Sequence, residues 1–321
     1  MLNKNNKTPD NFQTVLFCFI LFSVIALSLP EVSAYDPLYL DNPTEVLHSM
    51  KMCGNVAFGY FGANSYWESD TSGTSISVEL DPPLGVLRFL MTGRYGLTNS
   101  HTISVIIPAY LKLQGYGDSL AMGIADPWFT FDGWLSRSPM LIARGAVRFP
   151  LNEALEMMDY NESDRHAALD GSLTIETPLT HGGITFEGTA GLRYYFRAWD
   201  GMPLSVKDSA NTKPPIELRL TGHLSFPLNP ELSLVIGGDY AVRGDTDAEI
   251  DGEKEIIEHS DFSALDIRTG FVLLHDPLEL MIEVFYRVSG DNTDKEWGIM
   301  FDGTGINYWE MFGGSTSGSG R

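Results

Sequence analysis

The sequence predicts an all-β fold, a transmembrane antiparallel β-barrel of about 12 strands, with 14 strands as the alternative. Three observations predict it. Apolar and polar residues alternate with a period of two from about residue 54 to the end of the chain. The alternating runs match the roughly 9 to 11 residues that a tilted strand needs to cross a bilayer, and exceed the roughly 5 to 6 of an ordinary strand. Short and long connections also alternate, which is typical of outer-membrane barrels.

Composition and charge narrow the class of protein. The chain has 321 residues, with 42 acidic against 21 basic side chains and a formal net charge of −21. A nucleic-acid-binding protein needs a basic surface, so nucleic acid is not an expected partner. The cysteines are Cys18 and Cys53, and only the second lies after residue 34, which excludes a disulfide within one mature chain. After residue 34 no apolar run reaches helix length, so any membrane insertion must use strands.

Residues 1–34 have the three-part pattern of a secretory signal peptide. Lys4 and Lys7 form a positive start, residues 15–29 are apolar, and Val32-Ser33-Ala34 places small residues at the cleavage positions. A membrane anchor is the alternative, but the apolar stretch is shorter than the roughly 20 residues that a spanning helix needs. We therefore expect export and removal of this segment.

Three further regions follow the signal peptide. Residues 35–53 form a short N-terminal segment, in which Asn42 can cap a helix that has Pro43 at its first position. We favour a periplasmic helix outside the barrel for this segment over a plug inside the lumen. Residues 54–312 form the barrel. Residues 313–321 form a flexible Gly/Ser tail.

The clearest strands are 184–196, 216–226, 232–242 and 278–288, each with an apolar face and a charged face. In a soluble sandwich the charged face would meet water, whereas in a membrane barrel it would line the lumen. Strand length, loop asymmetry and aromatic residues near strand ends favour the barrel over a secreted sandwich. The aromatic groups expected at the membrane interfaces are Tyr194-Tyr195-Phe196 with Trp199, Trp128 with Trp134, and Tyr308-Trp309 with Phe312.

The connections give the orientation. Short connections are expected at 96–100, 136–139, 179–182, 227–231 and 275–277, and long ones at 115–120, 152–165, 198–214, 243–259 and 290–294. Short turns belong on the periplasmic side, which makes 84–95 a descending strand and 54–63 an ascending one. Residues 64–83 then form the first outer loop, within which 75–80 can extend the strands. The region 295–312 holds either one long bulged strand or two strands, and two would give the count of 14.

Charged residues on the inward face are the candidate functional surface. They can form a charged lumen that selects or conducts solute. Alternatively, arginine–carboxylate pairs can neutralise one another and fill a narrow barrel, which we favour for any single residue. The lumen-lining candidates are Arg88, Lys112, Arg144, Arg148, Glu176, Glu187, Arg193, Glu217, Arg219, His223, Asp239, Asp266, Arg268, Glu279, Glu283 and Arg287. Inward aromatic residues and methionines, such as Trp128, Tyr195 and Met281, can add apolar patches for a hydrophobic cargo.

One acidic loop has the spacing of a calcium site. Asp247-x-Glu249-x-Asp251-Gly252 with Glu258 matches the pattern D-x-[DN]-x-[DN]-G-x₅-E, except for Glu249. Because the loop joins two strands instead of two helices, we expect no specific metal and no cofactor. An acidic outer loop held to lipopolysaccharide by diffuse divalent ions is the preferred interpretation. No H-E-x-x-H, G-x-S-x-G or P-loop motif is present, so an enzyme is not expected.

Several segments resemble the outer-membrane family described as the MetA pathway of phenol degradation, putative transporters of hydrophobic compounds. The segments are Arg94-Tyr95-Gly96-Leu97-Thr98 leading to Pro108, Gly123-Ile124-Ala125-Asp126-Pro127, Leu141–Pro150, and Tyr286-Arg287-Val288-Ser289-Gly290-Asp291. The chain is more loosely similar to fatty-acid transporters, which carry an N-terminal plug. The resemblance implies passive passage of a small hydrophobic or amphipathic solute.

Two other functions stay open. A general diffusion porin would have an open lumen with some preference for cations, given the net charge. A structural or adhesion barrel would have a lumen fully occupied by paired side chains. In each case we expect the outer membrane as the location. The expected partners are membrane lipid, lipopolysaccharide, a small-molecule solute and the barrel-insertion machinery.

Overall fold

The computed structural model describes residues 38, 46–47, 49, 51–69, 75–114, 121–150, 166–179, 183–196, 213–250, 253–257, 261–275 and 278–310. The expected signal peptide and the Gly/Ser tail lie outside the described residues. No helix within these ranges is long and apolar enough to cross a membrane.

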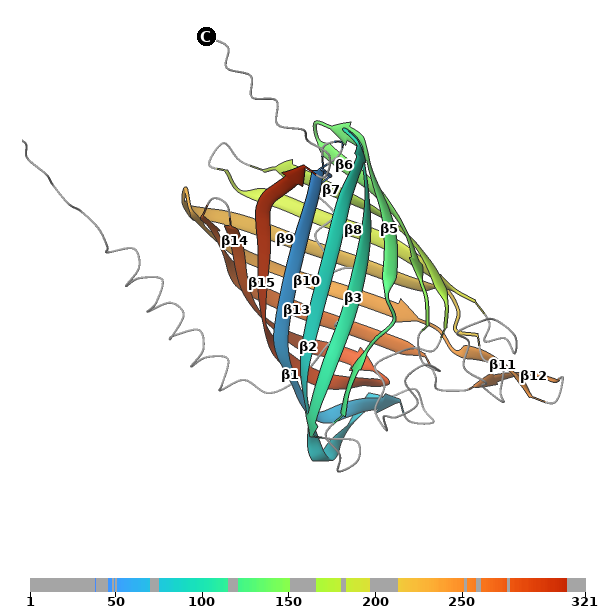
Figure 1. Ribbon diagram of the computed structural model, residues 1–321. Helices are drawn as coiled ribbons and strands as arrows, with labels where there is room; N and C mark the ends of the chain where they lie inside the picture. The colour runs from blue at the N-terminus through green and yellow to red at the C-terminus, as the bar shows by residue number, and fades with distance from the viewer. Residues whose placement is uncertain are drawn as a thin grey trace, which may run out of the picture.

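Twelve antiparallel strands form a closed wall (Figure 1). The wall strands are β1 (Lys51–Ser69), β2 (Ser75–Thr98), β3 (His101–Gln114), β5 (Trp128–Arg137), β6 (Met140–Arg148), β7 (Ala168–Pro178), β8 (Thr185–Tyr195), β9 (Glu217–Asn229), β10 (Leu232–Arg243), β13 (Phe262–His275), β14 (Leu278–Asp291) and β15 (Thr293–Glu310). The additional strands are β4 (Ala121–Ile124) and the separate hairpin of β11 (Thr246–Ile250) and β12 (Glu253–Ile257).

The barrel closes because the first and last strands pair with each other. β1 pairs with β15 on one side and with β2 on the other, and β2 pairs in turn with β3. The region 295–312, which left the strand count open, contributes one continuous strand as far as Glu310. The expectation of 12 strands is therefore confirmed, and the count of 14 is wrong. Closure leaves no wall strand with an unpaired edge.

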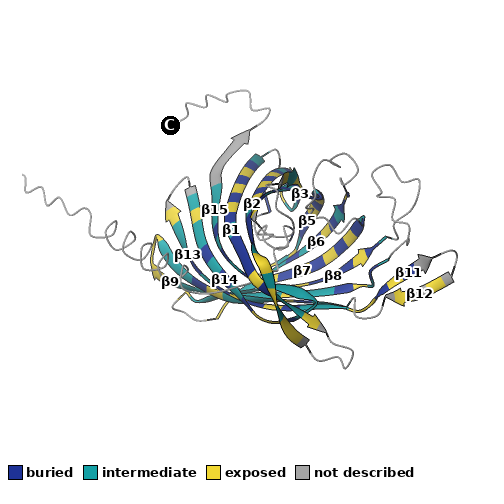
Figure 2. Cartoon of the chain, turned by 90° about the horizontal axis from the view of Figure 1, so that it is seen from below, coloured by how far each residue is buried: buried dark blue, intermediate teal, exposed yellow. Residues whose placement is uncertain are grey.

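Burial alternates most clearly along β7 and β8, with the polar side inward. In β8, Leu192 is 56% exposed whereas the next residue, Arg193, is 2% exposed. Figure 2 shows the same striping along β5 to β8. A soluble sandwich would bury the leucines and expose the arginines, so the sandwich alternative is wrong. Charged residues inside and apolar residues outside are the arrangement of a barrel in lipid.

The two rims of the barrel differ. At one rim the first and last strands meet, with Lys51 opposite Glu310, and tight turns join β2 to β3, β5 to β6, and β9 to β10. The hairpin of β11 and β12 projects at the opposite rim (Figure 1). There β1 and β2 also extend as a ribbon in which Ser69 pairs with Ser75, as expected for residues 75–80. Short turns mark the first rim as periplasmic.

One expected loop is wrong. Residues 290–294 were assigned a long outer connection, but β14 ends at Asp291 and β15 begins at Thr293. Asn292, with a φ of 47°, is the one residue between the two strands, whose pairing with each other ends at Tyr286 opposite Trp297. Asparagine tolerates this left-handed conformation better than most residues, which suits it to the point where the chain passes from the end of β14 beside β13 to the start of β15 beside β1. Its Nδ2 also donates to the backbone oxygen of Asp261 at 2.8 Å.

The wall between β3 and the strand after it is interrupted. β4 pairs with residues 109–112 of β3, and β5 pairs with residues 101–106 of the same strand. The two strands therefore lie end to end beside β3. Residues 125–127 separate them, opposite Pro108, whose oxygen accepts a bond from the Ala125 nitrogen at 2.9 Å. Pro108 and Pro127 have no backbone N–H to donate to the hydrogen-bond ladder, which explains why the strand breaks here.

Candidate functional site: the lumen

Ion pairs fill much of the described lumen. Arg88 binds Glu296 through two bonds of 3.0 Å. Arg144 binds Asp132 with its Nε at 2.6 Å, and Arg193 binds Asp170 at 3.2 Å. All of these side chains are buried. Buried charges need partners in a medium from which water is largely excluded, and these pairs supply them.

Glu217 is the centre of a larger cluster beside β8. It accepts a hydrogen bond from the Tyr195 hydroxyl at 2.6 Å and pairs with Arg219. Arg193 lies 3.6 Å and Arg243 lies 3.8 Å from its oxygens. Because one buried carboxylate faces three guanidinium groups, its charge is central to the stability of this part of the lumen.

A second cluster lies on β10, β13 and β14. Arg268 pairs with Asp239 and, at 3.3 Å, with Glu283. Arg287 binds Asp266 with its Nε at 2.8 Å, and both side chains are fully buried. These contacts join three consecutive wall strands across their inward face.

Leu38 lies inside the barrel. Its side chain is 2% exposed and packs in a cluster with Ala57, Leu90, Ile106, Trp128, Ala146, Ala168, Tyr195 and Met300. The Nη1 of Arg144 donates to its backbone oxygen at 3.0 Å. Further along, the nitrogen of Leu47 donates to the Thr102 hydroxyl at 2.8 Å, and that of Ser49 to Asn99 at 3.2 Å. The described residues before β1 therefore run from the periplasmic rim into the lumen.

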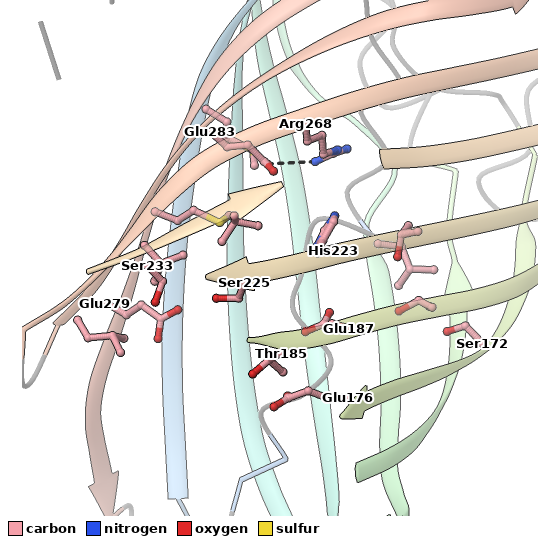
Figure 3. Close-up of a pocket in the computed structure, with 18 of the residues that line it drawn as sticks. Ser172, Glu176, Thr185, Glu187, His223, Ser225, Ser233, Arg268, Glu279 and Glu283 are labelled. Carbon is pink, nitrogen blue, oxygen red and sulfur yellow. Dashed lines mark hydrogen bonds and ion pairs between the residues drawn. The ribbon is translucent and has the colours of Figure 1, made fainter. Parts of the chain in front are cut away.

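A cavity of about 340 Å³ opens beside Leu38 (Figure 3). Its wall is mixed. Glu176, Glu187, Glu279 and His223 supply charged or titratable groups, and serine and threonine hydroxyls from β7 to β10 lie between them. The apolar part consists of Leu38, Val235, Val272, Leu274, Met281 and Met300. A site of this composition suits a small amphipathic molecule.

All but one of the candidate residues fall into two groups. Arg88, Arg144, Arg148, Arg193, Glu217, Arg219, Asp239, Asp266, Arg268, Glu283 and Arg287 take part in ion pairs within the lumen. Glu176, Glu187, His223 and Glu279 line the cavity, which Arg144, Arg268 and Glu283 also reach. Lys112, also a candidate, is fully buried.

Several partners were not among the candidates. Glu296 and Asp132 pair with Arg88 and Arg144, and Asp126 lies 3.9 Å from Arg148. Asp132 lies an even number of residues from Trp128 and Trp134, which places it on the same inward face of the strand. The alternation in the sequence could therefore have identified it. Asp126 sits in the break between β4 and β5, where strand parity gives no guidance.

Trp128 and Tyr195 appeared both among the interfacial aromatic residues and among the inward ones, and the inward prediction is the correct one. Trp128 is 2% and Tyr195 is 1% exposed, and the guanidinium of Arg148 lies within 5.5 Å of both rings. Tyr194, directly before Tyr195, does face outward and packs edge-on against Phe196. The alternation of the strand thus divides an aromatic run between lipid and lumen.

The calcium-like spacing falls on an extended hairpin. Asp247 pairs with Ile256 and Glu249 with Lys254, so residues 246–250 form a strand that does not wrap around an ion. Asp251, Gly252 and Glu258 lie outside the described residues. In the described ranges no group of three or more His, Cys, Asp or Glu side chains is arranged to hold a metal ion.

Solved structures of similar fold are outer-membrane barrels. An outer-membrane channel from Pseudomonas putida F1 gives a TM-score of 0.64 at 15% identity, covering 87% of this chain and 100% of that one. The NanC porin is more distant, with a TM-score of 0.47 at 8% identity, covering 78% of this chain and 98% of that one. The TodX monoaromatic hydrocarbon channel has a TM-score of 0.37 at 7% identity, covering 83% of this chain and 92% of that one. No family model and no curated protein matches the sequence significantly. The closed fold of 12 strands and the band of apolar side chains on its outer face together define this protein as a β-barrel of the outer membrane.

Proposed function

We propose that the chain is an outer-membrane channel for the passive passage of small hydrophobic or amphipathic solutes. The observation that carries the proposal is the burial of Leu38 inside the lumen, in a cluster of apolar side chains. A lumen filled in this way disfavours a wide aqueous path, and the adjoining cavity offers apolar surface together with polar groups. The segments that resemble the MetA-pathway family support the same solute class.

The proposal includes the biogenesis and surroundings of the barrel. Export through a signal peptide ending at Ala34 and insertion by the barrel-insertion machinery would bring the chain to the outer membrane. The acidic hairpin of β11 and β12 projects at the rim opposite the short turns, where it would meet lipopolysaccharide.

Single-channel recording separates this proposal from the porin alternative. The chain without residues 1–34, refolded into a planar bilayer, is expected to give no stable ohmic steps, because Leu38 and the ion pairs occupy the lumen. Insertion is checked independently by heat-modifiable migration and by flotation with lipid vesicles. Stable ohmic steps from the intact chain would instead establish a continuous water-filled pore and the porin function.

A further inference from the structure

The inward faces of β7 and β8 meet in three kinds of directly opposed pair. Near the outer rim, Asp170 lies opposite Arg193, and the two form an ion pair. In mid-strand, Thr174 lies opposite Thr189, and their hydroxyls are 2.8 Å apart. Near the periplasmic rim, Glu176 lies opposite Glu187. The first two pairs satisfy each other, whereas the third places two carboxylates side by side.

Two like charges directly opposite each other on neighbouring strands are unfavourable. Among the described residues, neither Glu176 nor Glu187 makes a hydrogen bond or an ion pair. Both are half-buried and line the cavity (Figure 3). The two guanidinium groups that reach the same cavity, those of Arg144 and Arg268, are already bound to Asp132 and to Asp239 with Glu283. The cavity therefore has an excess of acceptors for a positive charge.

His223 continues this row on β9. It lies opposite Glu187 on one side and opposite Gly237 on the other. A Cβ at position 237 would come within 2.1 Å of the His223 ring, so only glycine leaves room for that ring. The Nε2 of His223 is buried without a hydrogen-bond partner among the described residues. The ring nitrogen of His223, beside Glu187, is thus a further polar group available to a bound molecule.

We propose that this cavity binds a protonated amine carried on an apolar body, so that amphipathic amines are a preferred class of solute. The ammonium group would lie between Glu176 and Glu187, and the apolar body would lie against Val272, Leu274 and Met281. This inference rests on the proposed channel function. A hard metal ion suits the cavity less well, because Mg²⁺ and Ca²⁺ require a shell of oxygen ligands and gain nothing from the six aliphatic side chains in this wall.

Calorimetric titration of the chain without residues 1–34 in phosphatidylcholine nanodiscs tests the inference. Hexylammonium is the probe, and hexanol, hexanoate and methylammonium are the comparators, each corrected for its heat with empty nanodiscs. We expect saturable binding of hexylammonium that is about tenfold or more tighter than that of each comparator, because a charged hydrogen bond and apolar contact both contribute. Equal binding of hexanol would exclude recognition of charge, and equal binding of methylammonium would exclude the apolar part.

Matched variants locate the site. The double variant Glu176→Gln/Glu187→Gln is expected to weaken hexylammonium binding about tenfold or more, while relieving the repulsion between the two strands and preserving the fold. Glu231→Gln, at an exposed periplasmic turn, is expected to bind as the wild-type chain does. A double variant that binds normally would overturn the inference. Ohmic pores in the intact chain would overturn the proposed function without changing this binding result.

Discussion

Deleting residues 35–49 is expected to convert a silent barrel into an ohmic pore. Leu38 is buried inside the lumen, and the apolar cluster to which it belongs includes the small Ala57, Ala146 and Ala168. Removing Leu38 would therefore join its space to the cavity of about 340 Å³. The deletion ends before β1 begins at Lys51, so the wall pairing of β1 with β15 is retained. Single-channel conductance at fixed salt measures the effect.

A milder variant serves as the graded control for the deletion. Thr102→Val removes the hydroxyl that accepts the bond from the Leu47 nitrogen and leaves the length of the chain unchanged. One buried hydrogen bond contributes about 1 kcal/mol, so its loss should let the segment before β1 leave its place for short times. We therefore expect brief channel openings that reach the conductance of the deletion variant. If the deletion variant inserts and still conducts nothing, the segment before β1 does not close the lumen.

Glu217→Gln is expected to lower the free energy of unfolding by about 3 to 5 kcal/mol. The substitution keeps the size of the side chain but removes the charge that faces Arg193, Arg219 and Arg243. Their positive charges would then repel one another in a buried place. Urea unfolding in lipid vesicles, followed by tryptophan fluorescence, gives the free energy.

Two comparisons make the Glu217 experiment specific. Glu231→Gln, which changes an exposed carboxylate in a turn, should alter the free energy of unfolding by no more than about 0.5 kcal/mol. Adding Arg219→Gln to Glu217→Gln should recover part of the loss, because it removes one of the opposing charges. A loss below about 1 kcal/mol for Glu217→Gln alone would show that the cluster is not a stabilising centre.

The strands and their inward faces were predictable because a single rule governs them. A strand in lipid must present apolar side chains on one side, so the parity of Leu192 and Arg193 is enough to place both. The same parity placed Glu176 and Glu187 in the lumen. It also indicated that Trp128 and Tyr195 point inward, which overrides the general tendency of aromatic residues to lie at membrane interfaces.

The remaining features depend on geometry that periodicity does not contain. The turn at Asn292 requires one residue in a left-handed conformation. The break at residues 125–127 reflects Pro108 on β3 and Pro127 next to β5, neither of which can donate to the ladder. Leu38 is far from any strand pattern, and its place in the lumen is shown by the apolar cluster that it joins and by the hydrogen bond from Arg144. The pairing of Arg88 with Glu296 likewise joins residues 208 positions apart.

Uptake of a neutral fluorescent aromatic compound by cells tests the proposed transport most directly. The cells have an outer membrane with lipopolysaccharide in its outer leaflet, and uptake is compared between cells that do and do not produce the barrel. The amount of the barrel in the outer membrane is measured, and a hydrophilic dye of similar size reports leakage. The channel proposal predicts several-fold faster uptake of the aromatic compound in cells with the barrel, with uptake of the dye unchanged. Equal uptake of the aromatic compound in both cells would contradict it and favour a structural barrel.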